Sequence, residues 1–146
     1  MIALLQRVLR ASVTIEDRVH ARIGKGLLVL VGVRPEDGEA QAARLLDRLL
    51  GYRVFADDAG RMNRSLRDCG GGLLLVPQFT LAADTARGSR PGFSTAAPPD
   101  QARRLFESLV ARAQDAWPQT AAGVFGADMQ VELVNDGPVT FWLEAR

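Results

Sequence analysis

The sequence predicts one α/β domain over residues 1–146, a mixed β-sheet or barrel with two helices packed on it. Three observations predict this fold class. The first third of the chain is rich in branched apolar residues in extended patterns. Two later segments place apolar residues at helical spacing. No linker or internal repeat divides the 146 residues, and a chain of this length can bury one sizeable core.

The first third is expected to be β structure. A polar turn at residues 16–18 separates extended segments, and the segment after it alternates apolar with polar side chains. The unbroken apolar run at 27–33 is typical of a strand that is buried on both faces. We therefore predict strands over residues 2–9, 11–15, 19–23 and 27–33.

Two helices are predicted further along the chain. The first follows the acidic breaker at 35–38, carries Ala42, Leu45, Leu46, Leu49 and Leu50 at helical spacing, and ends at Gly51. The second opens at residues 98–100 and is stopped by Pro118. Its apolar stripe comprises Ala102, Leu105, Phe106, Leu109, Val110, Ala113 and Trp117.

Shorter elements fill the rest of the chain. Turns are expected at 57–60 and 135–138, where Asp, Asn, Gly and Pro gather. Residues 82–97 should form a long loop rich in Gly, Ser, Thr and Arg, and loops of this length are usually functional or mobile. The remaining strands are predicted at 52–55, 73–76, 129–134 and 139–143.

Composition limits the possible functions and the compartment. A net charge of +1 excludes a strongly basic nucleic-acid binder but leaves room for a local RNA-binding patch. Lys25 is the single lysine, so cationic groups are nearly all arginines, which suit phosphate contacts but can also reflect genomic base composition. One cysteine, no signal-like pattern in residues 1–7 and no membrane-length apolar run predict a cytoplasmic protein without membrane contact.

The inventory of catalytic side chains is nearly empty. His20 is the only histidine, so a histidine-based metal cluster or acid–base pair cannot form, and we expect His20 to face solvent from a strand. Cys69 should be a small buried or half-buried thiol. No common nucleotide-binding, hydrolase or metalloprotease motif is present. We expect neither a metal nor another cofactor.

Two segments nevertheless stand out. Pro77-Gln78-Phe79-Thr80 follows a buried strand and so delivers polar groups at a strand end, where ligand sites commonly lie. A strand that simply continues with surface Gln and Thr is the alternative. Gly137-Pro138 is either an ordinary turn or a cis pair, and the residues alone leave that open.

With these segments in view, the chain resembles the D-aminoacyl-tRNA deacylase family along essentially its whole length. Single tetrapeptides carry little weight, but eight segments in the right order and spacing are specific. They are Gln6-Arg7-Val8, Ser12-Val13-Thr14, residues 23–33 (IGKGLLVLVGV), Gln78-Phe79-Thr80-Leu81, Arg90-Pro91-Gly92-Phe93, Ala96-Ala97-Pro98-Pro99, residues 125–131 (FGADMQV) and residues 135–140 (NDGPVT).

The resemblance implies that family's fold and a homodimer with active sites at the subunit interface. It implies a catalytic pocket at Gln78, Phe79 and Thr80, which holds the terminal adenosine and the ester of a D-aminoacyl-tRNA. It also implies that Gly137-Pro138 is a cis pair, which enters the partner's pocket, holds the amino group and blocks an L side chain. Arg7 would orient this pair, and Met129 would line the adenine pocket.

The implied reaction is ester hydrolysis, a chiral proofreading step that should also accept glycyl-tRNA, because glycine has no side chain to reject. An aminoacyl ester is already activated, so oriented N–H groups of Phe79 and Thr80 and a ribose hydroxyl could suffice. Thr80 as a covalent nucleophile is the rival mechanism, but it has no visible base. Pro77 replaces the family's usual Ser and removes a hydroxyl and an N–H.

Two other functions remain open at this point. One is a related editing domain with another stereochemical preference, such as that of threonyl-tRNA synthetase, against which Gly137-Pro138 argues. The other is a catalytically idle tRNA-binding protein, against which Gln78-Phe79-Thr80 argues while Pro77 favours it. The sequence does not locate the RNA-binding arginines, although Arg87 and Arg90 in the long loop are the first candidates.

Overall fold

A computed structural model describes residues 1–146, and its main feature is a mixed six-stranded sheet. The strands run in the order β2-β1-β3-β6-β7, and β8 pairs with β1. β1 is antiparallel to each of its neighbours, whereas β3, β6 and β7 run parallel. Their bounds are β1 (Ile2–Ile15), β2 (Arg18–Ile23), β3 (Gly26–Gly32), β6 (Gly72–Pro77), β7 (Thr120–Ala122) and β8 (Gln130–Glu144).

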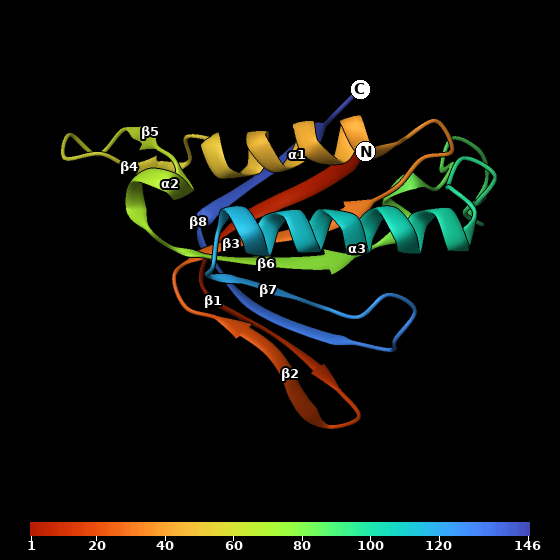
Figure 1. Cartoon of the computed structure of the whole chain (residues 1–146), viewed down its shortest axis with the longest axis horizontal. Helices are drawn as coiled ribbons and strands as arrows, with labels where there is room; N and C mark the ends of the chain where they lie inside the picture. Colours follow the sequence, from red (N-terminus) through yellow and green to blue (C-terminus); the bar gives the residue numbers. More distant parts are fainter.

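Two helices, α1 (Glu39–Gly51) and α3 (Pro99–Ala116), lie side by side over the central strands (Figure 1). Their buried side chains are those of the predicted apolar stripes, apart from half-buried Val110 and Trp117. The predicted mixed sheet with two packed helices is therefore confirmed. Four short elements complete the chain: β4 (Phe55–Ala56), β5 (Met62–Arg64), α2 (Leu66–Cys69) and the 3₁₀ helix η1 (Phe79–Ala82).

The two faces of β3 and β6 enter two different hydrophobic clusters, as the apolar run at 27–33 predicts. Leu27, Val29 and Val31 alternate into the large cluster beneath the helices. Leu28 points into a smaller cluster on the opposite face, enclosed by β1, β2, β7 and β8, and Leu74 of β6 joins it there. Because successive side chains of a strand point to opposite faces, a central strand between two cores must be apolar throughout.

The segment around Gly137 is not the turn between two strands that we predicted. β8 is one strand, and both of its halves pair with β1 in the same direction. Between the pairs Gln6–Thr140 and Val8–Asn135, β1 advances two residues and β8 five, so β8 carries three extra residues. Residues 136–139 of β8 therefore have no partners on β1 and leave the ladder as a bulge, with Gly137-Pro138 exposed on it.

Smaller predictions also need correction. Residues 2–15 form one continuous strand, and the predicted strand at 52–55 is reduced to β4, which pairs with β5. β5, β7 and the single-turn α2 were not predicted, because three or four residues show no measurable periodicity. None of the helices combines the length and apolar character needed to cross a membrane.

Candidate functional site

Pro77 ends the pairing between β6 and the chain that follows β7. The Leu73 N–H donates to the Gln119 carbonyl (3.0 Å), and the Gly123 N–H donates to the Leu75 carbonyl (2.8 Å). The next donor of this ladder would be the N–H of residue 77, which proline lacks. On the other side, the Gln78 N–H still donates to the Val31 carbonyl of β3 (2.7 Å). Beyond Pro77, the chain therefore stays bonded to β3 but is free to separate from the segment that follows β7.

A cavity of about 470 Å³ lies where these segments separate. One wall is the end of β6 with Gln78 and Phe79, and the opposite wall is residues 125–129 before β8. Eight of its 13 lining residues are hydrophobic, so it suits a flat apolar group with polar edges. Ala97, Pro99, Ala102 and Val131 complete the lining.

Met129 and Phe125 are fixed in this wall by specific contacts. A Cβ on Gly123 would lie 2.8 Å from the Met129 sulfur and 3.4 Å from Pro77 Cδ, so glycine there makes room for both. The Arg103 guanidinium lies 5.0 Å from the centroid of the Phe125 ring, a cation–π distance. Met129 was predicted to line the pocket, whereas Phe125 was missed because a single Phe before a strand has no distinguishing pattern.

The backbone of η1 supplies two free donors at the edge of the cavity. Phe79 and Thr80 are its first two residues, so their N–H groups have no intrahelical acceptor, and neither makes another hydrogen bond. Both side chains are exposed. The Gln78 amide donates to Thr80 Oγ1 (2.5 Å), and this amide nitrogen is the only side-chain partner of the Thr80 hydroxyl. Thr80 lines a second cavity of about 650 Å³, whereas its neighbours Gln78 and Phe79 line the first.

Hydrogen bonds from Arg7 and to Asn135 fix the backbone of the β8 bulge. Arg7 Nε donates to the Asp136 carbonyl (3.1 Å), and its Nη1 donates to the Val54 carbonyl (2.6 Å). The side-chain Oδ1 of Asn135 accepts the Val139 N–H (2.9 Å), which closes the bulge across its base. Arg7 was expected to orient the Gly137-Pro138 pair, whereas Asn135 had no predicted role.

Gly137 is the residue of the bulge that tolerates no side chain. Its φ is +134°, a conformation that L residues rarely adopt, and a Cβ would lie 2.7 Å from Val139 Cγ2 and 3.2 Å from Arg7 Nη2. The Gly137–Pro138 peptide bond is cis, the geometry that the resemblance implies. Neither residue lines the cavity of its own chain. The fold thus brings Gln78, Phe79 and Met129 together around one cavity, with Thr80 next to Phe79. Gly137 and Pro138 lie outside this cavity, on the exposed bulge of β8.

The remaining candidates lie apart from the cavity. Arg87 and Arg90 are exposed in the loop at residues 83–97, and neither forms an ion pair. His20 faces solvent from β2, as predicted. Cys69 is exposed, so the predicted buried or half-buried thiol is wrong: α2 ends at this residue on the surface. No group of three or more His, Cys, Asp and Glu residues is positioned to hold a metal ion.

The strongest electrostatic perturbation lies at the end of β8. Hydrogen bonds from Arg34, Trp142 and Arg146 lower the pKa of Glu144 to about 2. Arg34 Nη2 approaches Glu144 Oε1 at 3.0 Å, and the same contact raises the pKa of Arg34. Arg34 and Trp142 also line the second cavity next to Thr80. Charge at this edge of the sheet is therefore held in fixed pairs.

Comparison with known proteins identifies the family. A sequence model of the D-Tyr-tRNA(Tyr) deacylase family matches residues 4–144. The D-aminoacyl-tRNA deacylase of Pseudomonas aeruginosa is 63% identical over 145 residues, which cover 99% of this chain and 100% of that protein. That of Alkalilimnicola ehrlichii is 60% identical over 146 residues, covering 100% and 97%. The Salmonella typhimurium enzyme is 60% identical over 144 residues, covering 99% of each.

Solved structures share the fold over the full length. A structure titled c-Myc DNA Unwinding Element Binding Protein superposes with a TM-score of 0.95 at 37% identity, covering 100% of this chain and 99% of the other. A probable eukaryotic D-amino acid tRNA deacylase superposes with a TM-score of 0.86, covering 98% of each chain. Its 16% identity supports the fold alone.

Sequence and structure thus agree over nearly all of the chain. The match includes the cavity wall at 125–129, the free N–H groups of η1 and the bulge of β8. The chain therefore belongs to the D-Tyr-tRNA(Tyr) deacylase family, whose members are D-aminoacyl-tRNA deacylases and hydrolases.

Proposed function

We propose that this protein hydrolyses the ester bond of D-aminoacyl-tRNA in the cytoplasm, where charged tRNA is used, and so removes D-amino acids before translation. The single observation that carries the proposal is the pair of free N–H groups of Phe79 and Thr80 at the edge of an apolar cavity. The cavity would receive the terminal adenosine between Phe125, Met129 and the end of β6. The ester would then lie over η1.

The two N–H groups would stabilise the oxyanion. Water attacks the ester carbonyl carbon, negative charge develops on its oxygen, and the bond to the ribose oxygen then breaks, with that oxygen taking up a proton. One oriented donor is worth roughly 2.7–4 kcal/mol of barrier in comparable oxyanion sites. The neighbouring ribose hydroxyl would assist the attacking water. Pro77 does not impair this mechanism, because neither donor belongs to it.

A nucleophilic role for Thr80 has weaker support. A hydroxyl nucleophile needs a base to take its proton, and the only side-chain partner of Thr80 Oγ1 is the Gln78 amide, which donates. We therefore assign Thr80 a positioning role. Mass spectrometry of a quenched reaction should show no aminoacyl adduct on Thr80, and Thr80→Ser should remain active. Accumulation of such an adduct would establish the nucleophilic mechanism instead.

Rejection of L-aminoacyl-tRNA would require a homodimer. Gly137 and Pro138 are exposed and lie outside the cavity of their own chain, so a second copy must supply them if they act on the same substrate. D and L substrates differ only in side-chain direction once the ester and amino group are held. A backbone wall fixed by Arg7 and Asn135 can therefore exclude the L side chain by collision. Glycyl-tRNA should pass this filter, because it has no side chain to collide.

The function is tested by incubating the enzyme with D-Tyr-tRNA, L-Tyr-tRNA and Gly-tRNA, each labelled on the amino acid. We expect release from the D and glycyl substrates and none from the L substrate. Equal cleavage of D and L esters would refute the chiral filter and favour an editing domain of different specificity. Binding of tRNA without cleavage of any substrate would indicate a catalytically idle RNA-binding protein.

The filter itself is tested with Gly137→Ala. The added Cβ collides with Val139 and Arg7 and must displace the bulge, so we expect D-Tyr-tRNA cleavage to fall by about a hundredfold, or about 2.7 kcal/mol of barrier. Val139→Ala is the matched control: it removes apolar side-chain contacts with the bulge and the core but keeps the Val139 N–H bond to Asn135 and leaves Gly137 unchanged, so activity should be retained. Size-exclusion chromatography should show the same dimer for both variants. Cleavage of D-Tyr-tRNA by Gly137→Ala at the wild-type rate would show that the bulge has no role in the reaction.

A further inference from the structure

An exposed pair of aromatic rings lies next to the cavity. The Phe79 and Phe93 ring centroids are 5.2 Å apart with an interplanar angle of 51°, and the rings are 52% and 47% exposed. Phe79 lines the cavity, whereas Phe93 lies beyond it on the loop at 83–97. An exposed aromatic side chain does not contribute the stabilising free energy that it would contribute if it were buried. The pair therefore forms an apolar surface continuous with the cavity and open to solvent.

Phe93 is held in this position by backbone bonds on both sides. Before it, Gly92 exchanges two hydrogen bonds with Asp84, of 2.8 and 2.9 Å. After it, the Ala96 N–H donates to the Phe93 carbonyl (3.1 Å), and Thr95 Oγ1 donates to the Ala82 carbonyl (2.5 Å). The Phe93 ring is therefore exposed although the backbone on both sides of it is fixed by hydrogen bonds. A ligand that contacts it would meet a surface that is already in place.

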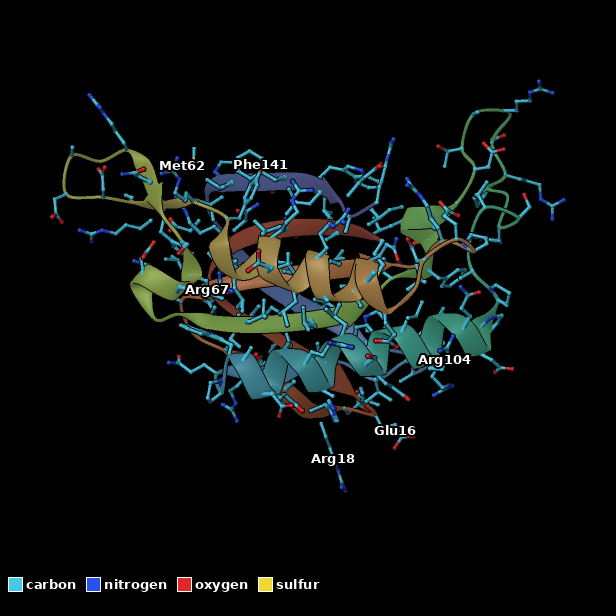
Figure 2. The ribbon with its side chains drawn as sticks, turned by 45° about the horizontal axis from the view of Figure 1, so that its top comes forward. Glu16, Arg18, Met62, Arg67, Arg104 and Phe141 are labelled. Carbon is cyan, nitrogen blue, oxygen red and sulfur yellow. The ribbon has the colours of Figure 1, made fainter.

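The same loop carries positive charge without internal neutralisation. Arg87 and Arg90 lie between the anchored ends of the loop and form no ion pair. Asp84 is the only acidic residue among residues 83–97, and its carboxylate accepts the Ala86 N–H (2.9 Å). Figure 2 shows the loop (green, upper right) extending from the body of the molecule. Exposed rings beside unpaired arginines match a nucleic-acid strand with unstacked bases.

We propose that Phe93, supported by Phe79, is a stacking platform for the unpaired nucleotide that precedes the terminal adenosine of tRNA, and that Arg87 and Arg90 hold phosphates of the same strand. This inference rests on the proposed function, which places the terminal adenosine in the adjacent cavity. The preceding base leaves the cavity where Phe79 lines its edge, and Phe93 is the next apolar surface in that direction. Stacking on a ring face is tolerant of base identity, so the platform would serve every tRNA.

The test compares two substrates that differ only in the upstream nucleotides, D-Tyr-tRNA and D-tyrosyl-adenosine. Phe93→Leu keeps an apolar side chain but removes the ring face, and we expect it to raise KM for D-Tyr-tRNA about tenfold. The same variant should change KM for D-tyrosyl-adenosine less than twofold, because that substrate fills only the cavity. Phe93→Trp retains a ring and should behave as wild type. A KM increase of equal size for both substrates, or for neither, would overturn the proposal.

Binding measurements keep the platform testable apart from catalysis. Phe93→Leu should weaken the affinity for uncharged tRNA, and it should not affect tRNA whose unpaired 3′ nucleotides have been removed. Failure of the wild type to cleave either ester would refute the proposed function, whereas equal loss of affinity for both tRNAs would refute the platform. Elution of Phe93→Leu as a monomer would also refute it, since the ring would then belong to a subunit interface.

The arginines are tested through salt dependence. Each phosphate contact with a single strand contributes about 0.7 to the slope of log affinity against log salt concentration. Arg87→Ala combined with Arg90→Ala should therefore lower that slope by about 1.4. Arg18→Ala is the matched control, because Figure 2 shows Arg18 at the tip of the β1–β2 hairpin, away from this loop. An unchanged slope in the double variant would remove the arginines from the RNA-binding surface.

Discussion

The two ends of β6 both open into cavities, and the two cavities differ in volume, lining and neighbouring hydrogen bonds. At the amino end, about 570 Å³ is lined by 12 residues, of which three are hydrophobic; they include Gly70, Gly71, Lys25 and Cys69. At the carboxyl end, the smaller cavity is mainly apolar and adjoins the two free N–H groups of η1. The proposed site is therefore in the smaller of these two cavities, and its lining and free donors, rather than its volume, support that choice.

The difference between the two ends lies in their backbone hydrogen bonds. At the amino end, the Gly72 N–H donates to the Lys25 carbonyl (3.0 Å), and Trp117 Nε1 donates to the Gly71 carbonyl (2.8 Å). A Cβ on Gly26 would lie 2.0 Å from the Gly72 carbonyl oxygen, so glycine is needed there for close packing. At the carboxyl end, Pro77 stops the ladder and η1 begins with unpaired donors. The amino end of β6 uses its backbone groups to bond neighbouring segments, whereas the chain after the carboxyl end leaves two N–H groups without a partner.

The largest effect should come from the amino end and should be on stability. Gly26→Ala places a methyl group against the Gly72 backbone, which cannot move aside as a side chain could. We expect the free energy of unfolding to fall by about 3 kcal/mol, at the upper end of typical overpacking. Denaturant titration measures it, and the activity per folded molecule should stay unchanged. A fully stable Gly26→Ala protein would contradict the assignment of this end as a packing junction.

The matched substitution at the carboxyl end is Gly123→Ala, which should act on substrate binding. Its Cβ meets the Met129 thioether, a flexible side chain that can shift, so the stability loss should stay below that of Gly26→Ala. The displaced sulfur would enter the cavity, and we expect KM for D-Tyr-tRNA to rise about tenfold, or about 1.4 kcal/mol. Steady-state kinetics with D-tyrosyl-adenosine should show the same increase. An unchanged KM for both substrates would place the adenosine outside this cavity.

The ion pairs of Glu144 with Arg34 and Arg146 at the end of β8 can be tested by varying the pH. The Glu144 pKa of about 2 in the folded protein lies below the ordinary value of 4.5, so its stabilising contribution is present above about pH 4.5 and is lost as the pH falls toward 2. After discounting for partial exposure, Glu144→Gln should cost about 1 kcal/mol at pH 7. The difference from wild type in urea titrations should vanish near pH 2. A constant difference across this range would refute the assigned cause.

The smallest effects should come from side chains of the amino-end cavity. Cys69 is exposed there, and neither it nor Lys25 lies near the free N–H groups of η1 in the proposed mechanism. Cys69→Ala, Lys25→Ala and treatment with a chelator should therefore each change D-Tyr-tRNA cleavage by less than about tenfold, or 1.4 kcal/mol. A larger loss in any of these assays would mean that the catalytic centre lies at the wrong end of β6.

Local patterns were sufficient to predict the framework. The apolar stripes of α1 and α3 and the run at 27–33 are short-range features, because the helical and strand periods fix which side chains share a face. The polar segment at Gln78, Phe79 and Thr80 was likewise located by its position after a buried strand. The identity of Gly137 and Pro138 was evident from the residues, but their position in the fold was not.

Only the tertiary structure decided how these parts are arranged. The bulge of β8 exists because both halves of that strand pair with β1, more than 110 residues earlier in the chain, in registers that differ by two residues. Phe125 and Phe93 became candidate site residues only in the folded chain, where the segment between β7 and β8 places Phe125 in the cavity wall and the loop at 83–97 places Phe93 against Phe79. The exposure of Cys69 depends on where the single turn of α2 lies on the surface. Each of these features arises from contacts between distant segments, which local periodicity does not encode.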